Sequence, residues 1–306
     1  MHLSARLLGM GAIHAAAAFT LACGSDSASP SPTSPAPGNP TSPEAVVLFD
    51  AGHYSSHSPS GTYAPFANIA RGTGRTVLPI TEINSTTLAQ GSVLVSVNVL
   101  HPSNLSNWTL PTPSAYSQAE VESVRAWVEA GGGLLLIADH MPFPGAAQEM
   151  ATAFGTQFSN GFAFDATQIS EPQTCLQTDE VHVFRQSDGT LWPHPTTMGV
   201  DAIATFTGSA FQSDGQPLMT FGATAVSLMP TTAWEFDATT PRVSVAGWQQ
   251  GAAKQVGAGR VVVLGEAAMF TEQVCDANVA MGMQSPVATG NRRFAANVVR
   301  WLGGEL

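Results

Sequence analysis

The chain has 306 residues, of which 11 are Lys or Arg and 22 are Asp or Glu, so its formal net charge is −11. This length is ample for a buried core, and the acidic balance argues against nucleic acid as a partner. Lys254 is the only lysine and there is no basic run, so attraction to anionic headgroups is not expected either.

Residues 1–22 have the features of a secretory signal peptide. Arg6 is the only charge before the apolar run of residues 7–22, which is too short to span a bilayer. The run leads into Cys23 in a stretch that is similar to a bacterial lipoprotein cleavage box, although Thr20 stands where an aliphatic residue is usual. We therefore expect export and a lipid anchor on Cys23, with an ordinary cleaved signal peptide as the alternative.

Residues 24–44 are rich in Ser, Pro and Thr and have almost no apolar side chains, which predicts an unstructured tether. Together with a lipidated Cys23, this linker would hold a folded domain of residues 45–306 off a membrane. The domain would face the periplasm or the cell exterior and would touch the membrane through the lipid only. Loss of residues 1–22 removes Arg6, which changes the net charge from −11 to −12.

Two cysteines, Cys175 and Cys275, remain when Cys23 is set aside. An even pair in an oxidising compartment favours one disulfide, and two buried free thiols are the alternative.

The folded domain is expected to begin with a strand at residues 46–49, whose four apolar residues suit a strand covered on both faces. Asp50, His53 and His57 follow on its exit loop. Ligands of open α/β sheets bind outside the carboxyl ends of the strands, so these titratable groups are candidates for a site.

The next elements alternate between helix and strand. Ser117 and Glu120 form a capping box that opens a helix, and a glycine run at 131–133 ends it. The strand at 134–138 then delivers Asp139 and His140 to the same edge as Asp50. In chain order we expect a helix at 62–72, a strand at 76–80, a short helix at 86–90, a strand at 92–100 ending at His101, the helix after Ser117, the strand at 134–138, a proline-broken turn at 141–145 and a helix at 146–154.

The pattern weakens from 155 to about 240, where short β-like runs alternate with polar turns and predict an elaboration on the sheet. His182 and His194 in this part are expected to be surface residues. Strands at 242–249 and 260–265 are expected to flank a glycine-rich turn region, and Glu266 follows the second strand directly. A helix at 291–302 should close the chain with Phe294, Val298, Trp301 and Leu302 facing inward.

The stretch GGGLLLIADHMPFPGAA occupies the place of a strand followed by a nucleophile turn, and with it the domain resembles the class I glutamine amidotransferase-like superfamily. This implies an α/β fold with a doubly wound, mostly parallel, flavodoxin-like sheet and a β-rich insertion. The stretches FDAGHYSSH, ADHMPFPGAA, HPTTMGVD, LGEAAMF and NRRFAANVVRWL are similar to a secreted bacterial branch of this fold that carries no assigned activity. The likeness covers roughly residues 45–306.

The chain departs from the amidotransferase pattern at the nucleophile. Those enzymes place a cysteine on the turn where this chain has Asp139, His140 and Met141, which excludes glutamine hydrolysis by a thiolate at that position.

The acids and histidines after the strands suggest a divalent metal instead, because nitrogen and carboxylate donors suit zinc, manganese or iron. A metal-bound water with a pKa of about 7 would supply hydroxide without a side-chain nucleophile. The expected ligands are Asp50, His53, Asp139 and His140. Glu266 is a fourth ligand or the general base, so Glu266 and Asp139 are the expected catalytic residues, with His57 and His101 as secondary candidates.

Other interpretations of the same residues stay open. An Asp or His at a strand end often caps a helix, and His53 could pair with Asp139. Ser55 or Ser56 beside His53 suggests a serine hydrolase, but no G-x-S-x-G elbow exists. The glycines at 72–74 lack phosphate-binding spacing, so no nucleotide is expected.

The favoured function is therefore metal-dependent hydrolysis of an ester, amide or glycan-derived substrate in the cell envelope. The alternative is a non-catalytic domain that binds a glycan or a protein, with tryptophans as contact residues: Trp108, Trp192, Trp234 and Trp248. An enzyme should hold its acids and histidines around an open cleft, whereas a binding module should have a filled edge and an aromatic patch elsewhere.

Overall fold

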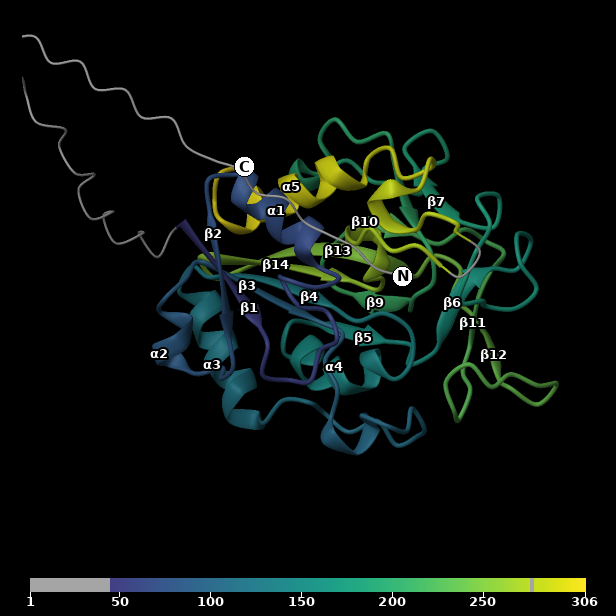
Figure 1. Cartoon of the computed structure of the whole chain (residues 1–306), viewed down its shortest axis with the longest axis horizontal. Coiled ribbons are helices and arrows are strands. Elements are labelled where there is room, and N and C mark those ends of the chain that lie inside the picture. Colours follow the sequence, from purple (N-terminus) through teal and green to yellow (C-terminus); the bar gives the residue numbers. More distant parts are fainter. Residues whose placement is uncertain (1–44, 276–277) are drawn as a thin grey trace, which may run out of the picture. The chain divides into compact units, whose positions relative to one another are not determined.

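The alternation of apolar strands and amphipathic helices produces a mostly parallel central sheet with helices on both faces (Figure 1). The computed structural model describes residues 45–275 and 278–306, so the predicted signal peptide, Cys23 and the linker lie outside the described residues. The described residues belong to one compact unit. None of their helices is long and apolar enough to cross a bilayer.

The central sheet has nine strands within the described residues, and its parallel half has the strand order β2-β1-β3-β4-β14. If these five parallel strands are renumbered 1 to 5 in chain order, β14 becomes strand 5 and the order is 2-1-3-4-5. This is the strand order of flavodoxin-like folds, and it confirms the predicted fold class. Its strands are β1 (Val46–Asp50), β2 (Thr76–Ile80), β3 (Val93–Val97), β4 (Gly133–Ile137) and β14 (Gly259–Leu264). Antiparallel strands extend the sheet: β13 (Gln249–Val256), β9 (Phe211–Ser213), β5 (Thr156–Phe158) and β10 (Gln216–Thr220).

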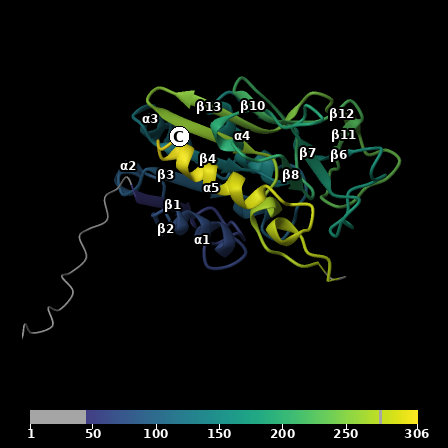
Figure 2. The same cartoon turned by 90° about the horizontal axis from the view of Figure 1, so that it is seen from above.

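Successive side chains of each strand point to opposite faces, so the sheet has two cores. Val47 and Phe49 lie in the core under α1 (Ala64–Gly72) and α5 (Asn291–Leu302). The second core lies under α2 (Ser85–Leu88), α3 (Gln118–Glu129) and α4 (Phe143–Ala153), and Leu48 belongs to it. Figure 1 shows these two helix layers, and Figure 2 shows α5 lying over the middle of the sheet.

The local signals that predicted two helices are confirmed. Ser117 accepts a hydrogen bond from the backbone N–H of Glu120, whose carboxylate accepts one from the N–H of Ser117, and α3 begins at the next residue. In α5 the four residues expected to face inward are all buried: Phe294, Val298, Trp301 and Leu302.

Several boundaries differ from the sequence prediction. The strand expected at 92–100 is β3 and ends at Val97, so His101 does not directly follow it. The expected strand at 242–249 is only β12 (Arg242–Ser244), and the glycine-rich segment after it is the long strand β13. Gly251 in this strand packs closely against Met219, whose terminal methyl group would lie 2.5 Å from a Cβ at this position. The expected proline turn is already helical, since α4 begins at Phe143 and accommodates Pro144 in its first turn, where no N–H is needed.

The predicted elaboration after residue 155 partly joins the central sheet, through β5, β9 and β10. The rest forms two small antiparallel sheets at one end of the unit (Figure 1). Their strands are β12, β11 (Ala225–Leu228) and β6 (Phe162–Asp165) in one sheet, and β7 (His182–Arg185) and β8 (Ala202–Thr205) in the other. Short 3₁₀ helices cover Pro102–Asn104, Pro195–Thr197, Ala268–Phe270 and Gly282–Gln284. A disulfide joins Cys175 to Cys275, with the Cα atoms 5.7 Å apart.

Candidate functional site

The expected site residues follow the carboxyl ends of adjacent strands, but strand register divides them into two groups. Ile137 of β4 pairs with Leu264 of β14, and Asp139 and Glu266 each come two residues later, so they lie side by side beyond the sheet. Asp50 lies deeper, because it follows the pair Phe49 and Val95, and β3 continues to Val97.

The deeper group, which we call the Asp50 network, has no open position. Asp50 is 1% exposed, and its carboxylate bonds to His53 Nδ1 at 2.8 and 2.9 Å and to the hydroxyl of Ser96 at 2.7 Å. The other ring nitrogen of His53 lies 3.1 Å from Glu120 Oε1. The predicted pairing of His53 with Asp139 is therefore wrong, since both ring nitrogens are already engaged.

His53 in this network is positioned to carry a proton. Burial by itself lowers the pKa of His53, but the hydrogen bonds and charges of Asp50 and Glu120 outweigh it, so the pKa is raised above 6.5. Both ring nitrogens face carboxylates, which favours the doubly protonated imidazolium form of His53. The network thus ties the loop after β1 to the first turn of α3.

The second group lines a cavity of about 250 Å³, which we call the edge cavity. Its polar wall comes from the loops after β1, β3, β4 and β14, and its remaining wall is largely aromatic. The lining residues are Ser56, His57, Asn98, Trp108, Asp139, His140, Phe143, Thr174, Phe206, Thr207, Trp234, Glu266, Ala268, Gln273 and Met281.

Two buried carboxyl groups, Asp139 and Glu266, form the polar centre of the edge cavity. Glu266 is fully buried and accepts the backbone N–H groups of Ala268 and Met269, each at 2.7 Å. Asp139 accepts the N–H of His140 at 2.8 Å. Burial raises the pKa of Asp139, and burial together with the charge of Asp139 raises the pKa of Glu266 well above its usual value. Two neighbouring buried carboxyl groups are costly to ionise together, which favours the protonated form of at least one of them.

His140 lies beside this pair inside an aromatic surround. Its Nδ1 donates to the carbonyl oxygen of Met141 at 2.7 Å, and its ring stacks on Phe162 and meets Trp234 edge to face, with centroids 4.6 and 4.7 Å apart. Burial lowers the pKa of His140, although the charge of Asp139 opposes the change. The ring is neutral, and its Nε2 is an acceptor in the wall of the cavity.

His57 and Ser56 contribute the rim after β1. Burial, and secondly the proximity of His140, lowers the pKa of His57 to about 4, so the ring is neutral at pH 7. The hydroxyl of Ser56 lies 3.2 Å from His57 Nδ1, whereas Ser55 bonds to the backbone of His57. Neither serine pairs with His53, so the predicted serine–histidine pairing is not formed.

The four predicted metal ligands are not assembled as one set. Within the ranges 45–275 and 278–306, no three His, Cys, Asp or Glu side chains are grouped so that they could hold one metal ion. Asp50 and His53 satisfy one another in the deeper group, and only Asp139 and His140 reach the edge cavity. His101 caps the 3₁₀ helix at Pro102–Asn104 instead, accepting the N–H of Ser103 at 3.2 Å.

Several residues of the two groups were missed by sequence reasoning. Asn98 directly follows β3, and its side-chain oxygen accepts the N–H of Asp139 at 2.9 Å. A polar residue at a buried strand exit was the signal that could have found it. Glu120 was assigned only to its helix cap, because nothing local in the sequence places a carboxylate of α3 beside His53.

Two loops that are hydrogen-bonded to each other place Trp108 and Trp234 in the wall of the edge cavity. Ala233 N–H donates to the carbonyl of Trp108, and Leu110 N–H donates to that of Thr231, both at 2.8 Å. Trp234 adopts a left-handed backbone conformation with φ of 66°, which is rare for a bulky residue and is found mainly at functional positions. The expected contact residues Trp108 and Trp234 thus belong to the same cavity as the acids, whereas Trp192 and Trp248 do not line it.

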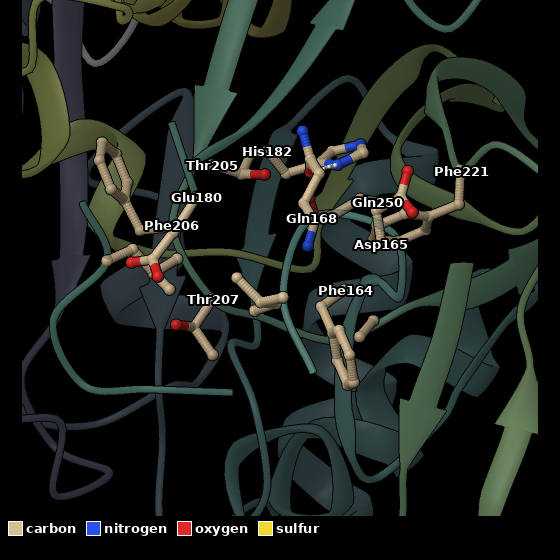
Figure 3. Close-up of a pocket in the computed structure, with 13 residues that line it drawn as sticks. Phe164, Asp165, Gln168, Glu180, His182, Thr205, Phe206, Thr207, Phe221 and Gln250 are labelled. Carbon is tan, nitrogen blue, oxygen red and sulfur yellow. Dashed lines mark hydrogen bonds between the residues drawn. The ribbon is translucent and has the colours of Figure 1, made fainter. Parts of the chain in front are cut away.

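A second cavity of about 10 Å³ lies behind the same wall, since Phe206 and Thr207 line both (Figure 3). It has room for about one water molecule and none for a substrate. His182 lines it and is half-buried rather than exposed as expected; burial is the main cause that lowers its pKa to about 4. His194 is likewise half-buried, and it caps the 3₁₀ helix at Pro195–Thr197.

Comparison with known proteins supports the fold and no more. No protein-family model matches the chain, and no curated protein matches it either. The mmIFT52 N-terminal domain is similar in structure with a TM-score of 0.56 and 14% identity, over 85% of this chain and 99% of that chain. A thua-like protein from Bacteroides uniformis ATCC 8492 gives a TM-score of 0.43 and 13% identity, over 88% and 95%. A cytoplasmic protein from Salmonella typhimurium LT2 gives 0.43 and 11%, over 84% and 99%.

At these low sequence identities, the structural similarity shows the fold alone. The resemblance to the class I glutamine amidotransferase-like superfamily stays a prediction.

Proposed function

We propose that the protein is an exported hydrolase that uses the Asp139 and Glu266 carboxyl pair for acid–base catalysis on an ester, amide or glycan-derived substrate. The observation that carries the proposal is the position of this pair, which lies at one strand register and lines a cavity at the sheet edge where ligands bind in open α/β folds. The aromatic wall beside the pair favours a glycan-derived substrate, because a flat ring can cover the apolar face of a sugar.

A pair with one ionised and one protonated carboxyl group has both roles needed for hydrolysis. The ionised carboxyl takes a proton from the attacking water as its oxygen bonds to the substrate carbon. The protonated carboxyl gives its proton to the leaving oxygen or nitrogen as that bond breaks. One proton remains on the pair after the reaction, as before it, and the raised pKa values of Asp139 and Glu266 favour a protonated carboxyl in the pair.

The neighbouring side chains hold the substrate and the pair. Asn98 fixes the backbone at Asp139, and the backbone N–H groups of Ala268 and Met269 orient Glu266. The neutral His140 offers Nε2 as an acceptor for a substrate hydroxyl.

The predicted divalent metal is a separate proposal. Asp139, His140 and Glu266 are of suitable types to bind one, but the described residues do not group three donors around one point. Export and lipid anchoring at Cys23 are also proposed; the disulfide between Cys175 and Cys275 supports an oxidising compartment.

The test is hydrolysis by the purified protein against chromogenic esters, anilides and glycosides across pH, with and without a chelator, alongside elemental analysis. We expect turnover of at least one class, lost in Asp139→Asn and kept in Asp188→Asn, a change at an exposed acid outside the cavity. No turnover of any class would contradict the proposal. Activity that disappears with the chelator would instead establish the metal.

A further inference from the structure

The edge cavity has acids but no basic side chain to balance them. Among the described residues that line it, none is Lys or Arg. The carboxyl groups of Asp139 and Glu266 therefore line the cavity without a Lys or Arg partner. Carboxyl groups without a basic partner attract a cationic ligand and repel an anionic one.

The aromatic wall adds a second attraction for the same kind of ligand. Trp108 and Trp234 line the cavity, and both side chains are half-buried, so each still presents ring surface. The faces of tryptophan rings attract cations, by about 0.5–1 kcal/mol at exposed positions and about 2 kcal/mol when water is excluded. The hydrogen bonds between the two loops fix both rings around His140 without help from a ligand.

The volume of the cavity limits the size of the cationic ligand. A volume of about 250 Å³ lies below the range of about 300–1,000 Å³ found for drug-sized ligands. The space therefore suits one ring rather than a polymer segment.

We propose that the edge cavity binds an organic ammonium group carried on a single ring-sized unit, such as a hexosamine with a free amine. This refines the substrate class of the proposed hydrolase and rests on the assignment of this cavity as its substrate site. The carboxyl groups of Asp139 and Glu266 would repel acidic sugars and phosphorylated compounds.

Equilibrium binding by isothermal titration calorimetry tests this directly. One series compares D-glucosamine, D-glucose and D-glucuronate, which share a ring and differ in charge. The other compares choline with 3,3-dimethylbutan-1-ol, its neutral isostere. We expect glucosamine and choline to bind at least tenfold more tightly than their neutral partners, and glucuronate not to bind.

Matched variants assign the effect to the cavity. Glu266→Gln should reduce the preference for the charged probes over the neutral ones, and Trp234→Leu should weaken choline binding by about 3- to 30-fold. Asp188→Asn and Trp192→Leu, at exposed positions that do not line the cavity, should match the wild type within twofold, with folding checked by circular dichroism.

Equal binding of charged and neutral probes, binding of glucuronate, or no binding of any probe would overturn the inference. Its failure is separable from that of the hydrolase. Tight ammonium binding without any hydrolysis removes the proposed activity alone, whereas turnover of neutral substrates with no preference for charge removes this inference alone.

Discussion

The Asp50 network and the edge cavity contain the same kinds of residue and lie at the same end of the parallel sheet, yet only one of them is open. In the Asp50 network each oxygen of Asp50 and each ring nitrogen of His53 has a protein partner, and these include Gly52, Ser96 and Glu120. In the edge cavity the acids have backbone donors, but no Lys or Arg is present among the described residues that line it. An acid–histidine pair at a strand end is therefore a site only where its partners leave room for a ligand.

This difference predicts opposite outcomes for similar substitutions. Changes in the edge cavity should alter chemistry and leave the fold intact, while changes in the Asp50 network should alter stability first.

The largest effect is expected for the catalytic pair. Glu266→Gln keeps the shape of the side chain and removes its proton transfer, so turnover should fall by about 10²- to 10⁴-fold. The measurement is kcat/KM on the substrate class identified in the hydrolysis screen, with urea unfolding as the check on the fold. Glu120→Gln, its counterpart in the Asp50 network, should keep turnover within tenfold of the wild type. An equal loss of turnover in both variants would contradict the assignment of catalysis to the edge cavity alone.

Asp50→Ala should cost about 3–5 kcal/mol of unfolding free energy, because it leaves the buried His53 without its main partner. Urea denaturation monitored by tryptophan fluorescence measures this. Asp188→Ala, at an exposed site, should change the free energy by about 0.5 kcal/mol or less. A loss below 1 kcal/mol for Asp50→Ala would show that the network adds little to stability.

The two histidines of the loop after β1 should affect stability in opposite directions with pH. The pKa of His53 is raised above 6.5 by folding, so its stabilising contribution is present below pH 6.5 and is lost as pH rises through the folded value. The pKa of His57 is lowered to about 4, so its contribution is present above pH 6.5 and is lost as pH falls toward 4. NMR titration of both rings, with urea unfolding of His53→Gln and His57→Gln across pH, measures each term. Parallel pH profiles in the two variants would contradict the assignment.

The smallest effect is expected at the helix cap that the Asp50 network shares. Ser117→Ala removes the cap of α3 and should cost about 1 kcal/mol. It also removes the serine hydroxyl that bonds Glu120 at 2.7 Å, so the His53 ring should titrate at a shifted pKa by NMR. Ser123→Ala, at a half-buried position of the same helix with no bond to Glu120, is the matched control and should leave the His53 titration unchanged. An unchanged His53 titration in Ser117→Ala would show that the helix cap does not influence the Asp50 network.

Much of the fold was readable from local pattern. The runs at β1, β3 and β4 are apolar at nearly every position because both faces of a parallel strand are covered, and the capping box located the start of α3. The long strand β13 was not readable, because its glycine and alanine residues look like a turn until Met219 and the neighbouring strands are packed against them.

For this chain, the sequence alone determined which side chains leave the strand ends and that the sheet is covered on both faces, because those properties depend on neighbours along the chain. Only the tertiary structure decided that Asp139 lies beside Glu266 and that His53, bonded locally to Asp50, meets Glu120 rather than Asp139. Strand register places Asp139 beside Glu266, and register comes from pairing between segments more than 100 residues apart, such as Ile137 with Leu264.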